Sequence, residues 1–174
     1  MNKISKVFFE KRREYARKYI SKYENLDIGS SNYPISDNSI SLDIRKEKKP
    51  NVVADTRFLP FRPNAFHSIS ILEVLEHFTT KDKQKIIKEI SRVCIGRVVI
   101  SIPNHSLFMD MPQKIIWELR ELTTQREYHN SKFTHAHIGC MSPSQFEEFL
   151  IQNGVKCIQK KRIMLYDYVF VCNI

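Results

Sequence analysis

The sequence predicts an α/β domain built on a mostly parallel sheet of seven strands, and three observations support this fold class. Short apolar runs rich in Val and Ile follow one another along the chain, as is typical of strands covered on both faces. Segments with helical spacing of apolar residues alternate with some of these runs. At 174 residues, of which 42% are hydrophobic, the chain can bury about 70% of its unfolded surface as one domain, 1–174, without disulfide bonds.

Residues 1–24 are expected to form a basic amphipathic helix, with its regular part over 3–23. Apolar side chains recur there at spacings of three and four residues, and Lys and Arg fill most of the other positions. Two interpretations stay open. The helix covers one face of its own domain, which its aromatic stripe favours, or it lies on nucleic acid or a membrane surface.

Five strands are expected in the first 103 residues. Their ranges are 25–28, 39–44, 51–55, 68–74 and 97–103. A helix capped by Thr80 separates the last two, and its inner face is formed by isoleucines and Val93. Only about ten residues, interrupted by Pro34, join the first two strands, so this parallel crossover has room for one helical turn at most.

The last third of the chain contains clear start and stop signals for a helix. Residues 142–145 (Ser-Pro-Ser-Gln) fit a capping box with proline at the first helical position, and Asn153-Gly154 fits a left-handed C-terminal stop. Two strands are expected to follow, near 155–163 and 166–173. As a hairpin, they would give the sheet an antiparallel C-terminal edge.

Carboxylates lie near the ends of the first three expected strands, at Asp27, Asp43 and Asp55. Ionised Asp is costly to bury without partners. In doubly wound sheets, ligands bind beyond the carboxyl ends of the parallel strands. Gly29 would allow a close backbone approach to such a ligand, and Asp43 is placed to accept hydrogen bonds from a ribose diol. The sequence therefore predicts a polar ligand across this edge.

With these features the chain resembles the class I, Rossmann-like S-adenosylmethionine-dependent methyltransferases, particularly the small type 11 group. The matching segments run in order from about residue 25 to 174. They are LDIGSS, SLDI, VVADTRFLPFRPNAFHSISILEVLEHF, RVVISIPN and HIGCMSPSQFEEFLIQNGVKCIQKK. The resemblance implies a three-layer fold, S-adenosylmethionine as cofactor, and methyl transfer to an N, O or C atom of an acceptor. The chain departs from the family at Ser31 and Tyr33, where the usual loop has glycines.

The resemblance also implies a set of cofactor-binding residues. For the methionine part of the cofactor these are Asp27, Gly29, Ser30 and Ser31. For the ribose and adenine they are Asp43, Ile44, Asp55 and Thr56. Leu72 and Glu73 would border the sulfur that carries the methyl group.

Catalytic and acceptor-binding residues are harder to assign. His77 and Glu73 are the candidates for a general base, although such a base is optional for methyl transfer, and His77 is equally well interpreted as a helix-start residue bonded to backbone. Residues 105–140 are expected to form a substrate or lid insert with a helix over 106–131, and His135 and His137 would line its acceptor pocket. No metal site is expected, because Cys140 is the only other obvious ligand near these histidines.

The formal net charge of +9 indicates either a partner such as RNA or an anionic surface, or simply a lysine-rich solvated surface. A methyltransferase-like binding module without catalysis is the alternative function. Four widely spaced cysteines without a CxxC pair favour reduced thiols and a cytoplasmic protein. No apolar run approaches the roughly 20 residues that a transmembrane helix needs.

Overall fold

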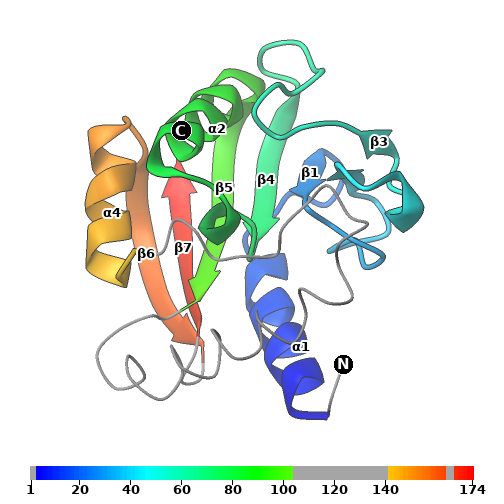
Figure 1. Cartoon of the computed structure of the whole chain (residues 1–174), viewed down its shortest axis with the longest axis horizontal. Coiled ribbons are helices and arrows are strands. Elements are labelled where there is room, and N and C mark those ends of the chain that lie inside the picture. Colours follow the sequence, from blue (N-terminus) through cyan, green and yellow to red (C-terminus); the bar gives the residue numbers. More distant parts are fainter. Residues whose placement is uncertain (1–2, 104–140, 164–166) are drawn as a thin grey trace, which may run out of the picture.

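The computed structural model describes residues 3–103, 141–163 and 167–174, which form an α/β domain (Figure 1). Its seven-stranded sheet has the order β3-β2-β1-β4-β5-β7-β6. The strands are β1 Asn25–Ile28, β2 Ile40–Asp43, β3 Val52–Val53, β4 Phe66–Leu72, β5 Cys94–Pro103, β6 Lys156–Ile163 and β7 Asp167–Asn173. The first five are parallel, and β7 is antiparallel to both β5 and β6. The predicted fold class is confirmed, with β7 inside the sheet and β6 at its edge.

In the described part of the chain, three α-helices cover the two faces of the sheet. They are α1 Lys3–Arg17, α2 Thr80–Val93 and α4 Pro143–Gln152, with 3-10 turns η1 Lys46–Lys48 and η2 Leu75–His77. Side chains of α2 and α4 pack with Val98 and Ile100 of β5 in the larger core cluster. On the opposite face, Ala16 of α1 packs with Val99 of β5. Because side chains alternate along a strand, successive residues of β5 serve the two faces in turn.

Helix α1 covers its own domain, as its aromatic stripe suggested, but it is shorter than predicted. The expected helix reached residue 23, whereas α1 ends at Arg17. The next backbone N–H groups, of Lys18 and Tyr19, form 3.2 and 3.0 Å hydrogen bonds to carbonyls three residues earlier. The Ser21 N–H then donates to Ser68 Oγ at 2.7 Å, so the chain has already turned towards β1.

The other helix ends follow from local capping. Thr79, not Thr80 as predicted, caps α2, because its side chain accepts a hydrogen bond from the Asp82 N–H. Ser142 and Gln145 form the predicted capping box of α4. Gly154 adopts a φ of 81°, and the Val155 N–H bonds to the Leu150 carbonyl at 2.9 Å, which confirms the predicted left-handed stop. Strands β4 and β5 begin two and three residues before the predicted starts.

The parallel crossover between β1 and β2 contains no helix. Its Ile35 is fully buried in the α1-side cluster, where it covers the part of the sheet that a crossover helix would otherwise cover. Arg13 donates to the Pro34 carbonyl, and Arg17 donates to the Ile35 carbonyl at 2.8 Å. Helix α1 therefore holds this short loop in place, and with it the start of the candidate site.

Some predicted features lie outside the described residues. These include the helix over 106–131, the whole of the expected insert 105–140, and the candidate acceptor residues His135 and His137. Within the described ranges, no helix is long and apolar enough to span a bilayer. The same ranges contain no group of three His, Cys, Asp or Glu side chains arranged to hold a metal ion.

Candidate active site

The carboxyl ends of β2, β1 and β4 meet at one edge of the sheet and build the candidate site. Ile28 of β1 pairs with Leu42 of β2 on one side and with Ile71 of β4 on the other. Beyond β1, the backbone N–H groups of Gly29 and Ser30 donate to the Leu42 carbonyl at 2.7 and 3.3 Å. The loop after β1 is therefore fixed directly against the end of β2.

Gly29 is a residue that the backbone geometry requires. Its φ of 71° lies in the left-handed region, and a Cβ atom built on it would lie 2.3 Å from Val74 Cγ2. This close approach ties the loop after β1 to the segment after β4, because Val74 directly follows Glu73.

Asp27 is buried below the surface of the site, with 2% exposure. Its Oδ2 accepts the Ile35 N–H and its Oδ1 accepts the Ser70 hydroxyl, both at 2.7 Å. Burial raises the pKa of Asp27, although both hydrogen bonds favour the ionised form. The described contacts thus give this carboxylate a role in joining the crossover loop to β4.

Asp43 lies at the end of β2 and holds the neighbouring loop. Its Oδ2 accepts the Ser31 N–H at 3.0 Å, and Arg45 binds both oxygens, with Nε and Nη2 each at 3.0 Å. Burial raises the pKa of Asp43, but the hydrogen bonds from Arg45 and Ser31 outweigh it and leave the pKa below its ordinary value. Ser31 has a φ of 51°, in the left-handed region that favours glycine. The usual family loop has a glycine at this position.

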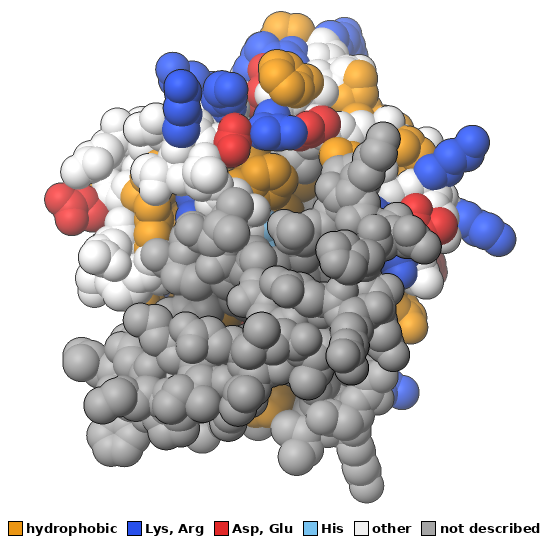
Figure 2. All heavy atoms as spheres, viewed as in Figure 1, with side chains coloured by type: hydrophobic (Ala, Val, Ile, Leu, Met, Phe, Trp, Pro, Cys, Tyr) orange, Lys and Arg blue, Asp and Glu red, His pale blue; other side chains and the backbone are white. Residues whose placement is uncertain are grey.

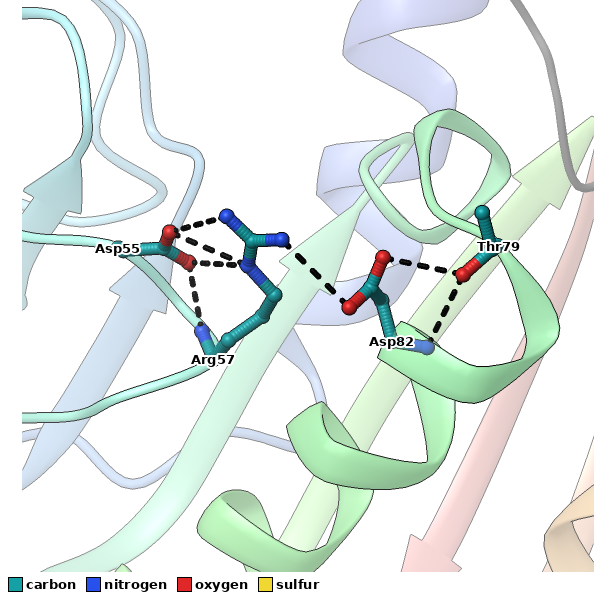
Figure 3. A network of polar contacts seen from close by, with 4 residues as sticks. All are labelled: Asp55, Arg57, Thr79 and Asp82. Carbon is teal, nitrogen blue, oxygen red and sulfur yellow. Dashed lines mark hydrogen bonds and ion pairs between the residues drawn. The ribbon is translucent and has the colours of Figure 1, made fainter.

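Asp55 is held by a similar arrangement (Figure 3). Arg57 binds both of its oxygens, with the shortest contact, Nη2 to Oδ2, at 2.6 Å. Arg57 also reaches Asp82 Oδ1 at 3.5 Å, and Thr79 donates its hydroxyl hydrogen to the other Asp82 oxygen, which connects the loop after β3 to the start of α2. The hydrogen bond from Arg57 lowers the pKa of Asp55 despite partial burial. Each carboxylate is thus held by the arginine two residues later, a repeated spacing that the sequence analysis missed.

The remaining predicted cofactor residues differ in exposure. Ile44 is 38% exposed and lies beside buried Asp43, while Thr56 is buried. Ser30 is also buried, and within the described chain its Oγ has no hydrogen-bond partner. Tyr33 turns outward and packs edge-on against Phe9, at 5.7 Å between ring centroids. Tyr33 replaces a glycine of the family pattern, but its ring points away from the loop after β1.

Glu73 lies in the turn directly after Leu72, the last residue of β4. Its φ is 56°, and its N–H donates to the Ser101 carbonyl and hydroxyl oxygens at 3.3 and 3.0 Å. The Ser101 hydroxyl donates to Glu73 Oε1 at 2.8 Å, and Arg12 Nη1 lies 3.6 Å from Oε2. Burial raises the pKa of Glu73 to about 7, against the opposing effect of the Arg12 charge. This carboxylate can therefore accept or release a proton near neutral pH.

Two further acids and a histidine lie beside Glu73. Glu76 is 4% exposed, and its Oε1 lies 3.8 Å from Nε2 of His77, the other predicted base. Asp167, at the start of β7, accepts a 2.6 Å hydrogen bond from Arg12 Nη1. Burial raises the pKa values of Glu76 and Asp167 as well. Sequence reasoning missed Glu76, Asp167 and Arg12, because nothing in local spacing brings Arg12 and Asp167, 155 positions apart, into contact.

Comparison with known proteins identifies the family of the chain. Residues 14–101, which are 88 of the 174 residues, match the model of the methyltransferase domain family. The chain belongs to that family. The resemblance to type 11 class I methyltransferases is thereby confirmed. No curated protein matches the sequence.

Solved structures show the same fold as this methyltransferase domain at low sequence identity. The PH0226 protein of Pyrococcus horikoshii superposes with a TM-score of 0.67 at 16% identity, over 99% of this chain and 92% of that one. A methyltransferase of Methanosarcina mazei that depends on S-adenosylmethionine gives 0.65 at 13%, over 91% and 96%. Magnesium protoporphyrin IX methyltransferase of Synechocystis, solved with bound S-adenosylhomocysteine, gives 0.62 at 12%, over 99% and 88%.

The residues at this edge of the methyltransferase domain fit S-adenosylmethionine in two respects. Ser30 Oγ, which has no hydrogen-bond partner among the described residues, offers a buried polar contact beside the loop. Exposed Ile44 offers an apolar surface beside the Asp43 carboxylate. In the structure, however, Arg45 and Arg57 bind the carboxylates that the resemblance assigns to the ribose and the adenine.

Proposed function

We propose that this protein transfers a methyl group from S-adenosylmethionine to an acceptor at the carboxyl edge of its sheet. The observation that carries the proposal is the convergence of three segments there: the loop from Gly29, the Asp43 carboxylate and the Leu72–Glu73 turn. The hydrogen bonds of Gly29 and Ser30 to Leu42, and the close approach of Gly29 to Val74, bring these segments together. In open α/β sheets, this edge is where ligands bind.

The cofactor would be held by residues of the loop after β1, of the end of β2 and of the segment after β3. Ser30 would donate or accept a hydrogen bond through its unpartnered Oγ, and Asp43 would accept the ribose hydroxyls once Arg45 leaves one of its oxygens. Asp55 and Thr56 would receive the adenine amino group, beside the apolar surface of Ile44. Asp27 would act as a positioning residue, because both of its oxygens already hold protein groups.

When bound, S-adenosylmethionine supplies an electrophilic methyl group on a sulfonium that is also the leaving group. The chain's part is then to orient the acceptor and exclude water, effects worth about 7–11 kcal/mol in well-aligned reactions. Where the acceptor atom carries a proton, Glu73 would take it at Oε2, because a pKa of about 7 suits a general base at neutral pH. His77, 28% exposed at the end of η2, is the second candidate.

Binding of S-adenosylhomocysteine tests the cofactor part of this proposal. At a ligand concentration one hundred times the Kd, the fold should gain about 2.7 kcal/mol of stability. For a chain of this size, that gain raises the melting temperature by about 5–11 °C. The absence of any shift at millimolar ligand would exclude the proposal. Incorporation of a labelled methyl group into molecules of a cell extract tests the transfer itself.

The alternative of a binding module without catalysis gains no support from the comparisons. A polyanion partner remains a prediction that concerns a different surface. Figure 2 shows Lys and Arg side chains around the rim of one face, with a few Asp and Glu side chains between them. Edge strand β6 adds exposed Lys156, Lys161 and Arg162.

A further inference from the structure

We propose that Glu73, Glu76 and Asp167, here named the acid cluster, bind a positively charged ammonium or guanidinium group of the methyl acceptor. The identity of the ligand as a methyl acceptor rests on the proposed function. The predicted binding of a cation does not depend on catalysis. It defines the chemical class of a substrate that the sequence analysis left open.

The acid cluster is built by three elements at the edge of the sheet. Glu73 follows β4, Glu76 lies in η2, and Asp167 begins β7. Ser101 of β5 donates a hydrogen bond to Glu73 Oε1, which fixes this carboxylate at the end of the strand. The Glu73 side chain is 22% exposed, whereas those of Glu76 and Asp167 are 4% and 6% exposed. Glu73 therefore connects a buried acidic region to the surface.

Among the described residues, the acid cluster has fewer positive charges around it than negative ones. Arg12 from α1 lies 2.6 Å from Asp167 and 3.6 Å from Glu73. One guanidinium thus faces three carboxyl groups, and fully ionised, uncompensated charges at such a depth are costly. Burial raises the pKa values of all three acids, which favours their neutral, protonated forms. A cationic ligand would replace those protons.

An unsatisfied hydrogen-bond acceptor marks the place for that cation. Glu76 Oε2 is buried and, among the described residues, has no hydrogen-bond partner. Leaving such an atom unpaired costs about 1–3 kcal/mol, and unpaired buried groups in natural proteins are exceptions that need an explanation. Arg12 Nε is likewise buried without a partner in the described chain. An ammonium or guanidinium beside an oxygen atom of the same ligand would satisfy both groups.

The position of the acid cluster places the cation next to the cofactor site. Glu73 directly follows Leu72 and precedes Val74, the residue in closest approach to Gly29. The acid cluster lies on the side of this turn that faces β5 and β7, whereas the cofactor loop lies on the side that faces β1 and β2. A cation bound there would lie beside the Leu72–Glu73 turn and would orient an acceptor towards the methyl group.

Titration with 4-aminobutanol, followed by amide NMR of the full chain, tests the inference. The matched neutral compound is 1,4-butanediol, in which a hydroxyl replaces the ammonium, and magnesium chloride is the third probe. We expect 4-aminobutanol to shift the amide signals of Glu73, Glu76, Ser101 and Asp167 in a saturable manner. The Kd should fall at least about threefold from pH 6 to pH 8, because binding displaces protons. Within the described parts of the chain, Arg12, Ser101 and His77 are the other charged or polar groups that face the acid cluster.

Two variants and a control separate the acid cluster from general surface charge. Glu76→Gln and Glu73→Gln should each weaken the binding of 4-aminobutanol at least about tenfold. Glu14→Gln should leave it unchanged, since Glu14 is exposed on α1 and pairs only with Lys11 in the described contacts. Using two variants keeps the test decisive if one of them fails to fold.

Three results would overturn the inference: equal shifts with 1,4-butanediol, shifts with magnesium but not with 4-aminobutanol, or no shift at these residues with any probe. S-Adenosylhomocysteine binding by the same samples separates the two proposals. A protein that binds S-adenosylhomocysteine but not 4-aminobutanol refutes the inference alone. A protein that binds 4-aminobutanol but not S-adenosylhomocysteine refutes the proposed function.

Discussion

Replacing Gly29 by Ala should destabilise the protein for two separate reasons. Alanine in the left-handed region costs about 1–2 kcal/mol. In addition, the new Cβ atom would lie 2.3 Å from Val74 Cγ2, and Val74 packs against the main core cluster. Forcing one extra carbon into a packed region costs typically about 1–3 kcal/mol. The expected loss of unfolding free energy is therefore about 2–5 kcal/mol.

Gly154 offers a matched control in the same chain. Its φ of 81° is also left-handed, but a Cβ atom there would meet no atom within 4 Å. Gly154→Ala should therefore lose only the conformational part, about 1–2 kcal/mol. Urea unfolding measures the loss of unfolding free energy in each variant. The difference between the two losses is the energy cost of the close contact with Val74. The double variant Gly29→Ala, Val74→Ala should lose less unfolding free energy than the sum of the losses of the two single variants.

Equal destabilisation by the two glycine substitutions, or a double-mutant cycle without coupling, would refute this reasoning. Either result would mean that the loop after β1 and the turn after β4 move apart at little cost. The affinity for S-adenosylhomocysteine gives a second measurement on the same proteins. Gly29→Ala should lower it, because Ser30 follows in the loop, and Gly154→Ala should not.

Other predictions concern single contacts. Asp43→Asn should weaken binding of S-adenosylhomocysteine by about 10–100-fold in calorimetry, as expected for loss of a charge-assisted hydrogen bond worth about 1.5–3 kcal/mol. Because folding raises the pKa of Glu73 from 4.5 to about 7, the folded state binds more protons between these values. Unfolding free energy should therefore fall as pH rises from about 4.5 to 7, by at most about 3 kcal/mol. Glu73→Gln should flatten this pH dependence in urea titrations. An unchanged slope in the variant would contradict the assigned pKa of Glu73. Ser142→Ala should cost about 1 kcal/mol through loss of the α4 cap, whereas exposed Ser144→Ala should cost less. Retention on RNA should weaken steeply between 50 and 200 mM salt, and retention that ignores salt would exclude an electrostatic partner.

Local patterns predicted the parts of the fold that depend on neighbours in sequence. The capping box at Ser142, the left-handed stop at Gly154 and the strand runs could be identified because each depends on a few consecutive residues. The end of α1 was wrong by six residues, since apolar spacing continues past Arg17 while hydrogen bonds to the crossover loop and to Ser68 turn the chain. Such contacts leave no periodic signal.

In the candidate site, too, some features depend on neighbours in sequence and others on contacts between distant residues. The repeated Asp-x-Arg spacing at Asp43 and Asp55 is visible in the sequence, but the bidentate geometry of each pair is a property of the folded loops. The contact of Arg12 with Asp167 joins opposite ends of the chain, and Glu76 is buried although it lies in a short turn. No single-sequence argument from spacing could have connected those residues.

The sequence by itself determined that the chain forms a mostly parallel α/β sheet, and it predicted Gly29, Asp43 and Asp55 near strand ends, at the edge where we propose that a ligand binds. These features follow from local propensity and from the polarity of parallel strands. Only the tertiary structure decided which carboxylates hold protein groups, which lie buried with too few cations, and which atom lacks a partner. Desolvation and charge compensation depend on every group within a few ångströms, and folding brings those groups together from distant parts of the chain.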